Sequence, residues 1–375
     1  MGSLALDEPG RRATTRPAPN PRVALVYPAP FGAAGVFGGG ERYAHQLGTA
    51  LSRRTPTRLI TFGEVATTHR DDKLDVVTYP ILRYLGGNRN NPLSAAFLRE
   101  LRWADVVHCL IWNTVATDLA TIFGRLTGKR VFVTDVGGGA GISLATRLRL
   151  GGLVDRFLLI AAQGGTQFER YRERWRIIFA GIDTVRFQTP ANPQRQGVLF
   201  VGRLLPHKGI DILIRALPED VPLTVVGRPY ETRYFELLQR LAMGKNVQFV
   251  TNAEDDDIVN AYQRAAVSVL PSVYRSVYGD FAPLPELLGF AAMEAMACGA
   301  AVIATDVGGM SEVVRNEETG LLVAPSDVDG LRRALQRLLG DALLRQRLGA
   351  AARAMIEREF TWPIVAERCL EAYVE

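Results

Sequence analysis

Cysteine, long apolar runs and a dinucleotide-binding fingerprint are scarce or missing in this sequence of 375 residues. The three cysteines, Cys109, Cys298 and Cys369, are odd in number and widely spaced, which argues against a disulfide framework and against a zinc site. No apolar run approaches the roughly 18 residues that a membrane-spanning helix needs. The first predicted strand is not followed by G-x-G-x-x-G and a downstream acidic residue, which argues against an NAD-dependent dehydrogenase.

The N-terminal region lacks the apolar segment of a signal peptide, and we expect a cytoplasmic protein in a reducing compartment. Residues 1–21 contain three arginines and four prolines, and predict a disordered tail. Of the 44 basic and 39 acidic residues, 25 basic and 15 acidic ones lie in residues 1–190. This excess of basic residues is typical of contact with an anionic acceptor or with the anionic inner face of a membrane. Arginines that lie on solvated surfaces are the alternative.

Strand and helix patterns alternate along residues 22–190. Short apolar runs rich in β-branched residues predict strands at 22–28, 57–62, 74–78, 105–110, 129–134 and 156–161. Helical patterns lie between most of them, at 41–52, 92–103 and 113–127. Strands that alternate with helices predict a parallel sheet covered on both faces.

A second alternating series follows the proline-punctuated stretch T-P-A-N-P (189–193), which is typical of a linker. Its predicted strands are 197–201, 222–226, 247–250 and 266–270, and its predicted helices are 209–217, 230–242 and 255–264. We therefore predict two doubly wound, Rossmann-like α/β domains, 22–190 and 191–360, that face each other across a cleft. The C-terminal helix, 361–375, is expected to pack back towards the first domain.

Two glutamates, Glu286 and Glu294, stand out in the run P-E-L-L-G-F-A-A-M-E-A-M-A-C-G, which an apolar strand follows. We expect Glu286 in the loop before a helix and Glu294 within the first turns of that helix. The amides of the helix N-terminus would then lie between two acids, an arrangement suited to a sugar nucleotide. Two solvated surface glutamates are the alternative.

Two cations, Arg203 and Lys208, follow the predicted strand 197–201 in the run V-G-R-L-L-P-H-K-G. At the carboxyl end of a strand they can bracket a diphosphate, because arginine offers a planar fork of donors and lysine a point charge. In the alternative, Arg203 caps a loop and Lys208 is solvated.

Residues 199–217 and 286–313 together resemble the signature of glycosyltransferase family 4, the retaining enzymes of the GT-B fold. The matching elements are G-R-x-x-x-x-K-G (202–209), E-x-x-G-x-x-x-x-E-A-M-A-x-G (286–299) and G-G-M-x-E (308–312). Weaker similarities in the first half are G-G-G-E-R (38–42), A-D-V-V-H (104–108) and A-G-I-D (180–183).

The resemblance implies a donor site in the second domain. Arg203 and Lys208, next to Gly202, would bind the donor diphosphate and stabilise the leaving nucleotide. Glu286 would contact hydroxyls of the donor sugar and Glu294 would hold the ribose hydroxyls. The remaining donor contacts would be backbone amides of Leu288, Gly289 and Phe290.

For the first domain, the resemblance implies that Gly38, Gly39 and Gly40 form a loop that closes over the donor sugar and phosphate. Asp135 follows a strand after which many relatives carry a histidine. We favour contact of its carboxylate with the sugar or acceptor hydroxyl over a cap of the glycine loop.

Three further residues are candidates for the acceptor side. His108 ends a strand and either faces the cleft or is a core histidine. Arg147 and Arg149 alternate with apolar residues, which is typical of acceptor or membrane-surface contact or of an ordinary amphipathic helix.

An inserted segment and an acidic segment of the second domain also call for an interpretation. Residues 273–285 are longer than the corresponding segment of relatives, and form a lid, an acceptor wall or a packed surface loop. Glu254–Asp257 precede a helix and are expected to cap it rather than to bind a metal ion.

The resulting hypothesis is a glycosyltransferase that moves a sugar from a nucleoside diphosphate to an acceptor hydroxyl with retention of configuration. The acceptor would be a glycan, a lipid-linked molecule or a small molecule. No metal, no further cofactor and no nucleic acid are expected. The alternatives are another GT-B enzyme, such as a glycoside phosphorylase or a sugar-nucleotide epimerase, and a non-catalytic protein that binds nucleotide sugars.

Overall fold

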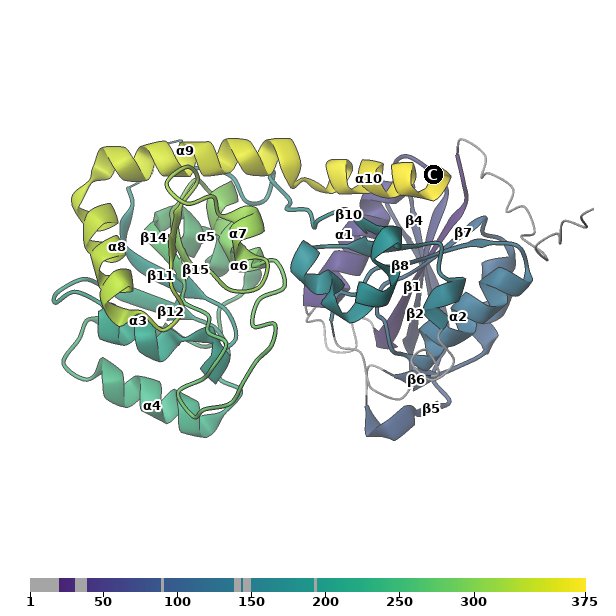
Figure 1. Ribbon diagram of the computed structural model, residues 1–375, viewed down its shortest axis with the longest axis horizontal. Coiled ribbons are helices and arrows are strands. Elements are labelled where there is room, and N and C mark those ends of the chain that lie inside the picture. The colour runs from purple at the N-terminus through teal and green to yellow at the C-terminus, as the bar shows by residue number, and fades with distance from the viewer. Residues whose placement is uncertain (1–19, 31–38, 89–90, 138–142, 144–149, 192–193) are drawn as a thin grey trace, which may run out of the picture. The chain divides into compact units, whose positions relative to one another are not determined.

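The computed structural model describes residues 20–30, 39–88, 91–137, 143, 150–191 and 194–375 of the chain (Figure 1). Their contacts divide into two units. The first contains the described residues up to Leu158 together with Glu367–Glu375, and the second contains Leu159–Ala366. Among the described helices, none is both long and apolar enough to cross a membrane.

A mainly parallel sheet lies at the centre of the first unit, in the strand order β10-β9-β8-β7-β1-β2-β4-β3. In the inner strand β1, residues 23–26 are apolar and fully buried, which is typical of strands covered on both faces. The edge strand β3 is antiparallel to β4, and its polar residues are all exposed, so no apolar pattern predicts it. The strands are β1 (Val23–Pro30), β2 (Thr57–Gly63), β3 (Thr67–Asp71), β4 (Leu74–Pro80), β7 (Val106–Cys109), β8 (Arg130–Val133), β9 (Arg156–Leu159) and β10 (Trp175–Ile177).

The helices α1 (Gly39–Ser52) and α2 (Val115–Leu126) pack against this sheet. Thr114 caps α2, because its side chain accepts a hydrogen bond of 3.3 Å from the amide of Thr117. Short 3₁₀ helices, η1 (Leu85–Gly87), η3 (Leu150–Leu153) and η4 (Ala162–Arg174), occupy several connections.

The prediction of a helix over 92–103 is wrong. The strands β5 (Arg83–Tyr84) and β6 (Pro92–Leu93) form a small antiparallel pair, and the 3₁₀ helix η2 (Ala96–Arg102) follows. The carbonyls of Asn91 and Leu93 accept hydrogen bonds of 3.0 Å from the amides of Leu85 and Leu82, which flank β5. These backbone groups are therefore used in the hairpin and cannot start a helix.

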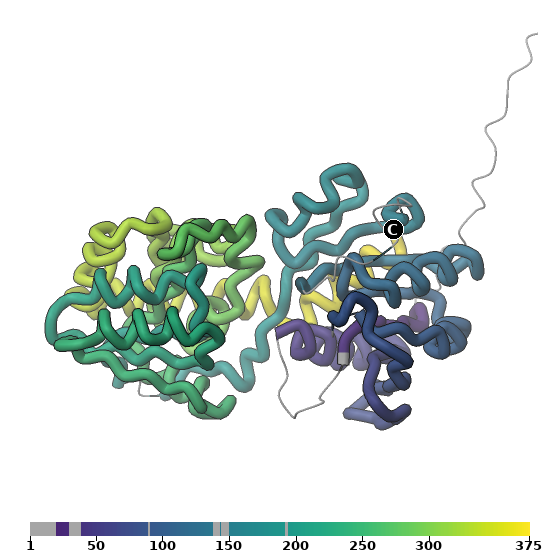
Figure 2. The backbone as a smooth tube through the Cα atoms, turned by 90° about the horizontal axis from the view of Figure 1, so that it is seen from below, coloured from purple at the N-terminus to yellow at the C-terminus, as the bar shows by residue number. Residues whose placement is uncertain are grey.

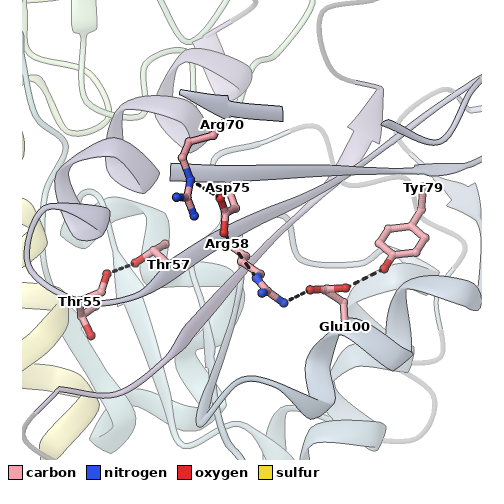
Figure 3. A network of polar contacts seen from close by, with 7 residues as sticks. All are labelled: Thr55, Thr57, Arg58, Arg70, Asp75, Tyr79 and Glu100. Carbon is pink, nitrogen blue, oxygen red and sulfur yellow. Dashed lines mark hydrogen bonds and ion pairs between the residues drawn. The ribbon is translucent and has the colours of Figure 1, made fainter. Parts of the chain in front are cut away.

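Polar contacts hold η2 on the face of the sheet (Figure 3). Glu100 of η2 accepts hydrogen bonds from Arg58 of β2 and, at 3.0 Å, from the hydroxyl of Tyr79 of β4. Asp75 of β4 pairs with Arg70 of β3 at 2.7 Å and lies 3.8 Å from Arg58. Because Arg58, Asp75 and Arg70 are in register on neighbouring strands, their side chains lie on one face.

A second parallel sheet, in the order β13-β12-β11-β14-β15-β16, lies at the centre of the second unit. In Figure 1, α3 lies between α4 and α8, and Figure 2 shows the backbone of the same unit from below. The strands are β11 (Gln196–Val201), β12 (Leu223–Val226), β13 (Val247–Val250), β14 (Ala265–Leu270), β15 (Ala301–Thr305) and β16 (Leu321–Val323). The helices are η5 (Pro206–Lys208), α3 (Ile210–Ala216), α4 (Thr232–Ala242), α5 (Asp255–Arg264), α6 (Phe290–Ala297), α7 (Met310–Val313), α8 (Val328–Gly340) and α9 (Ala342–Glu359).

The strand order of this sheet reverses between β11 and β14. From β11 the chain continues outwards to β12 and β13, and from β14 it continues in the other direction to β15 and β16. In open α/β sheets, ligands bind at the carboxyl ends of the strands at such a switch point. The residues that follow β11 and β14 are therefore the first place to look for a site.

The predicted fold class is confirmed, because both sheets are mainly parallel and alternate with helices. The predicted boundary at 190/191 stays a prediction: contacts group the chain from Leu159 onwards with the second unit, whereas β10 belongs to the first sheet. The last helix, α10 (Trp362–Val374), ends in the segment that belongs to the first unit.

Candidate functional site

An ion pair joins the two loops at the switch point of the second sheet. The ammonium group of Lys208, at the end of η5, lies 2.6 Å from Oε1 of Glu286. The same oxygen accepts a hydrogen bond of 2.7 Å from the hydroxyl of Ser272, which follows β14. The side chains of Lys208 and Glu286 are only 15% and 11% exposed. The structure therefore brings together two residues that the sequence separates, in a partly dehydrated pair.

Two close backbone approaches hold these loops in place. Gly209, after Lys208, has a φ of +65°, and a Cβ at this position would lie 2.0 Å from the carbonyl oxygen of Pro271. Gly308 has a φ of +53°, and a Cβ there would lie 1.8 Å from the carbonyl oxygen of Glu286. Only glycine fits either position, since both left-handed backbone and a missing side chain are needed.

One oxygen of the Glu286 carboxylate is available to a ligand. Both of its hydrogen bonds are to Oε1, and no partner for Oε2 is found among the described residues. A carboxylate that is fixed through one oxygen can accept a hydrogen bond from a ligand hydroxyl through the other.

The helix α6 begins beside this pair, as the sequence predicts. Gly289 is its N-cap and Phe290 its first residue. In the described part of the chain, the amides of Leu288, Gly289 and Phe290 have no hydrogen-bond acceptor. Unpaired amides at the start of a helix, with the positive end of its dipole, favour an anionic ligand.

Glu294 lies within α6, and Glu286 lies in the loop before it, so the predicted placement of the two acids is confirmed. The hydroxyl of Tyr262, on α5, donates a hydrogen bond of 3.0 Å to Oε2 of Glu294. Burial, and secondly the charge of Glu294, raise the pKa of Tyr262 well above its ordinary value, so the hydroxyl remains a donor. The sequence did not identify Tyr262, because nothing in the α5 pattern shows which residue it faces.

Arg203 follows β11 and is exposed. Its guanidinium carbon lies 5.9 Å from the centre of the Tyr230 ring, within the range of a cation–π contact. The two predicted cations therefore differ: Lys208 is held by carboxylate and hydroxyl groups, and Arg203 stands at the surface of the same loop.

The half-buried His207 precedes Lys208 in η5. Burial, followed by the nearby charge of Lys208, lowers the pKa of His207. A neutral imidazole is therefore favoured next to the lysine ammonium, which leaves Lys208 as the cation of η5.

The candidate site residues of the first unit include Gly39, Gly40 and Asp135, and they lie in a helix and in a loop. Gly39 and Gly40 are the first residues of α1 rather than part of a separate loop, and Gly38 lies outside the described residues. Oδ1 of Asp135 accepts hydrogen bonds from the amides of Trp112, at 3.2 Å, and Gly137, at 3.3 Å. This geometry supports the capping alternative for Asp135, and its catalytic role stays a prediction.

His108 is a core residue, which corrects its assignment to the acceptor side. Its ring is fully buried, with Nδ1 2.7 Å from the hydroxyl of Tyr373 and Nε2 2.8 Å from the hydroxyl of Thr134. Burial lowers the pKa of His108 to about 3. The other two acceptor-side candidates, Arg147 and Arg149, lie outside the described residues.

Residues 273–285 form a loop with its own hydrogen bonds, which supports the packed surface loop among the three predicted alternatives. The amide of Ser276 donates to the carbonyl of Asp280, and the amide of Ala282 to that of Tyr274, at 2.9 and 2.7 Å. The hydroxyl of Tyr274 accepts a hydrogen bond of 3.0 Å from the amide of Gly308, which anchors the loop beside Glu286.

The acidic run before α5 caps that helix, as predicted. Glu254 is the N-cap and forms a capping box with Asp257, whose carboxylate accepts a hydrogen bond of 3.0 Å from the amide of Glu254. These acids therefore have a structural role at the start of the helix.

Curated relatives are similar to about half of the chain. A mannosyltransferase of Corynebacterium glutamicum, described as GDP-mannose-dependent and acting on a monoacylated phosphatidylinositol monomannoside, is 38% identical over 211 residues, 50% of this chain and 53% of its own. A glycogen synthase of Mycobacterium tuberculosis is 31% identical over 208 residues, 53% of this chain and 48% of its own. The chain thus spans about half the length of the curated relatives it matches.

Solved structures are similar over nearly the whole chain. Sucrose-phosphate synthase from Thermosynechococcus elongatus has a TM-score of 0.69 at 24% identity, and covers 94% of this chain and 98% of its own. HepE of Anabaena, solved with UDP and glucose, has a TM-score of 0.70 at 18% identity, and covers 94% of this chain and 99% of its own. These similarities confirm the GT-B fold.

The family described as glycosyl transferases group 1 matches residues 181–355. This segment includes the Lys208–Glu286 pair, the start of α6 and the Tyr262–Glu294 contact. Residues 181–355, slightly less than half of the chain, are thus similar to the glycosyl transferases group 1.

Proposed function

We propose that this protein transfers a sugar from a nucleoside diphosphate sugar to an acceptor hydroxyl, with retention of the anomeric configuration. The observation that carries the proposal is the arrangement around α6: Lys208 paired with Glu286, one free carboxylate oxygen, and unpaired amides at the helix start. A cation and helix amides suit a diphosphate, and a carboxylate suits sugar hydroxyls. The family match over residues 181–355, and the GDP-mannose and UDP printed for relatives, support the same class of donor.

Each residue has a defined task in this proposal. Lys208 and Arg203 bind the diphosphate and neutralise the negative charge that develops on the leaving nucleotide. Glu286 accepts a hydrogen bond from a donor-sugar hydroxyl, and Glu294, oriented by Tyr262, holds the ribose. The acceptor is a glycan, a lipid-linked molecule or a small molecule, and no further cofactor is required.

The reaction needs no nucleophile from the protein. The bond between the anomeric carbon and the diphosphate oxygen breaks, and the acceptor oxygen forms the new bond from the same face. The proton of the acceptor hydroxyl passes to the departing phosphate oxygen. Lys208 and Arg203 favour this step because their charge stabilises the nucleoside diphosphate as it leaves.

Lys208→Ala tests the assignment of the diphosphate site. We expect turnover to fall by about two orders of magnitude or more, since a charge-stabilising group is lost. Lys245→Ala is the matched control, because Lys245 contacts only the carbonyl of Leu217 among the described residues. Near-normal turnover of a folded Lys208→Ala variant would contradict the assignment.

The donor and the reaction class are tested by binding and product analysis. Thermal shifts with UDP, GDP, dTDP and ADP identify the base, because a bound ligand raises the apparent stability. Stabilisation by none of the four would contradict the donor site. Nuclear magnetic resonance of the product anomer tests retention, and a requirement for inorganic phosphate would instead indicate a glycoside phosphorylase.

A further inference from the structure

A second pocket lies behind α6, against α9. Its volume is about 660 Å³, and the turn after α6, the starts of β14 and β15 and one side of α9 contribute to it. Small residues, among them Ala266, Gly299, Ala301 and Ala350, line its apolar part. We call it the α9 pocket.

Three arginines line the α9 pocket: Arg195, Arg345 and Arg353. The lining includes one acid, Glu357, which is 2.7 Å from Nε of Arg353. The charged residues of the lining therefore sum to a net positive charge. Like charges that lie close together in a partly buried site raise the free energy of the unliganded pocket, and an anion would lower it.

Backbone carbonyls hold two of the guanidinium groups close together. Nη2 of Arg195 donates to the carbonyl of Cys298, and Nη1 of Arg353 donates to that of Ala297, each at 2.5 Å. Because the two carbonyls belong to consecutive residues, the two guanidinium groups converge on the end of α6. Carbonyls orient the arginines but carry no net charge to neutralise them. Burial accordingly lowers the pKa of Arg195 from its ordinary value.

Arg345 has hydrogen-bond donors that are available to a ligand. Its hydrogen bonds to Leu338 and Leu339, the latter at 2.8 Å, both come from Nη1. Among the described residues, no acceptor is found for its Nη2 and Nε. Nη2 and Nε of one guanidinium are arranged as a fork that matches two oxygens of a phosphate group.

We propose that the α9 pocket binds a small organic phosphate, with the phosphate on the arginines and the neutral body over the alanine and glycine lining. The pocket volume falls within the range of sites for small organic molecules, about 300–1,000 Å³, and exceeds what a phosphate ion alone would fill. The charge selects an anion, and the apolar lining selects one with an organic body.

The pocket is connected to the donor site through Arg195. Nη1 of Arg195 also donates to the carbonyl of Tyr262, at 3.0 Å, and the hydroxyl of Tyr262 holds Glu294. A ligand on Arg195 therefore acts on the ends of both α5 and α6, and changes the affinity of the donor site. This coupling rests on the proposed function, whereas binding in the α9 pocket does not.

Calorimetric titration of the full chain with glucose 6-phosphate, inorganic phosphate and glucose tests the proposal. We expect glucose 6-phosphate to bind more tightly than inorganic phosphate, and glucose not to bind. Arg345→Gln should lower the affinity for glucose 6-phosphate at least about tenfold, because a charge-assisted contact is lost. Arg337→Gln is the matched control, since Arg337 pairs with the exposed Glu317 outside the pocket.

Lys208→Ala separates the α9 pocket from the donor site. Binding of glucose 6-phosphate that survives Lys208→Ala and is weakened by Arg345→Gln supports the proposal. The proposal is overturned if Lys208→Ala abolishes the binding of glucose 6-phosphate while Arg345→Gln leaves it normal. It is also overturned if glucose 6-phosphate does not bind to the wild type, or binds no more tightly than inorganic phosphate. The titration contains no nucleotide, so a failure of the donor-site proposal leaves this result unaffected.

Discussion

The acid sensitivity of folding tests the core assignment of His108. The ring is fully buried, and both of its nitrogens have hydroxyl partners, Tyr373 and Thr134. Burial lowers its pKa from 6.5 to about 3. The folded protein therefore keeps this ring neutral at pH values at which the same histidine in the unfolded chain takes up a proton.

The size of the effect follows from the two pKa values. Between pH 6.5 and about 3, the unfolded chain binds one more proton at His108 than the folded chain. Lowering the pH favours the state that binds more protons, so the free energy of unfolding falls by about 1.4 kcal/mol per pH unit in this window. This contribution to the free energy of unfolding is fully present well above pH 6.5, and roughly 3 kcal/mol of it is lost at pH 4.5.

Urea unfolding of the wild type and of His108→Gln, at pH 7.5 and pH 4.5, measures this contribution. Glutamine retains polar atoms for Tyr373 and Thr134 but does not titrate. We expect the free energy of unfolding of the wild type to fall by roughly 3 kcal/mol more than that of the variant between the two pH values. Other titrating groups contribute equally to both proteins and cancel in the difference.

Equal losses in the two proteins would refute the core assignment. A ring that titrates near 6.5 in nuclear magnetic resonance spectra would do the same, since an exposed histidine has this ordinary pKa. Either result would make His108 a candidate for the acceptor side again.

Two further substitutions test the second unit. Gly209→Ala should lower the free energy of unfolding by at least about 2 kcal/mol more than Gly244→Ala, because both glycines have positive φ, but only at Gly209 would the new Cβ meet the carbonyl of Pro271. Equal urea midpoints would contradict this close approach. Tyr262→Phe should raise the dissociation constant of the nucleoside diphosphate about 5- to 30-fold with little change in kcat, since the hydroxyl that orients Glu294 is removed. Unchanged nucleotide affinity in calorimetry would show that this hydroxyl does not position the carboxylate.

The sequence predicted those features that depend on neighbours along the chain. Alternating strand and helix patterns gave the fold class, because the period of apolar residues reports which faces are buried. The loop position of Glu286 and the helical position of Glu294 were predictable for the same reason. Where local pattern was weak, as in the exposed strand β3 or the hairpin before η2, the prediction failed.

Tertiary structure decided which of these residues meet. Lys208 and Glu286 are 78 positions apart, and only the switch point of the sheet brings their side chains together. The partner of Glu294, Tyr262, and the burial of His108 depend equally on packing between distant elements. The sequence by itself determined the order of the elements and the residue types available for chemistry. The tertiary structure determined which charges are paired, buried or available to a ligand, because the solvation of a charge and its distance to other charges are set only when the chain folds.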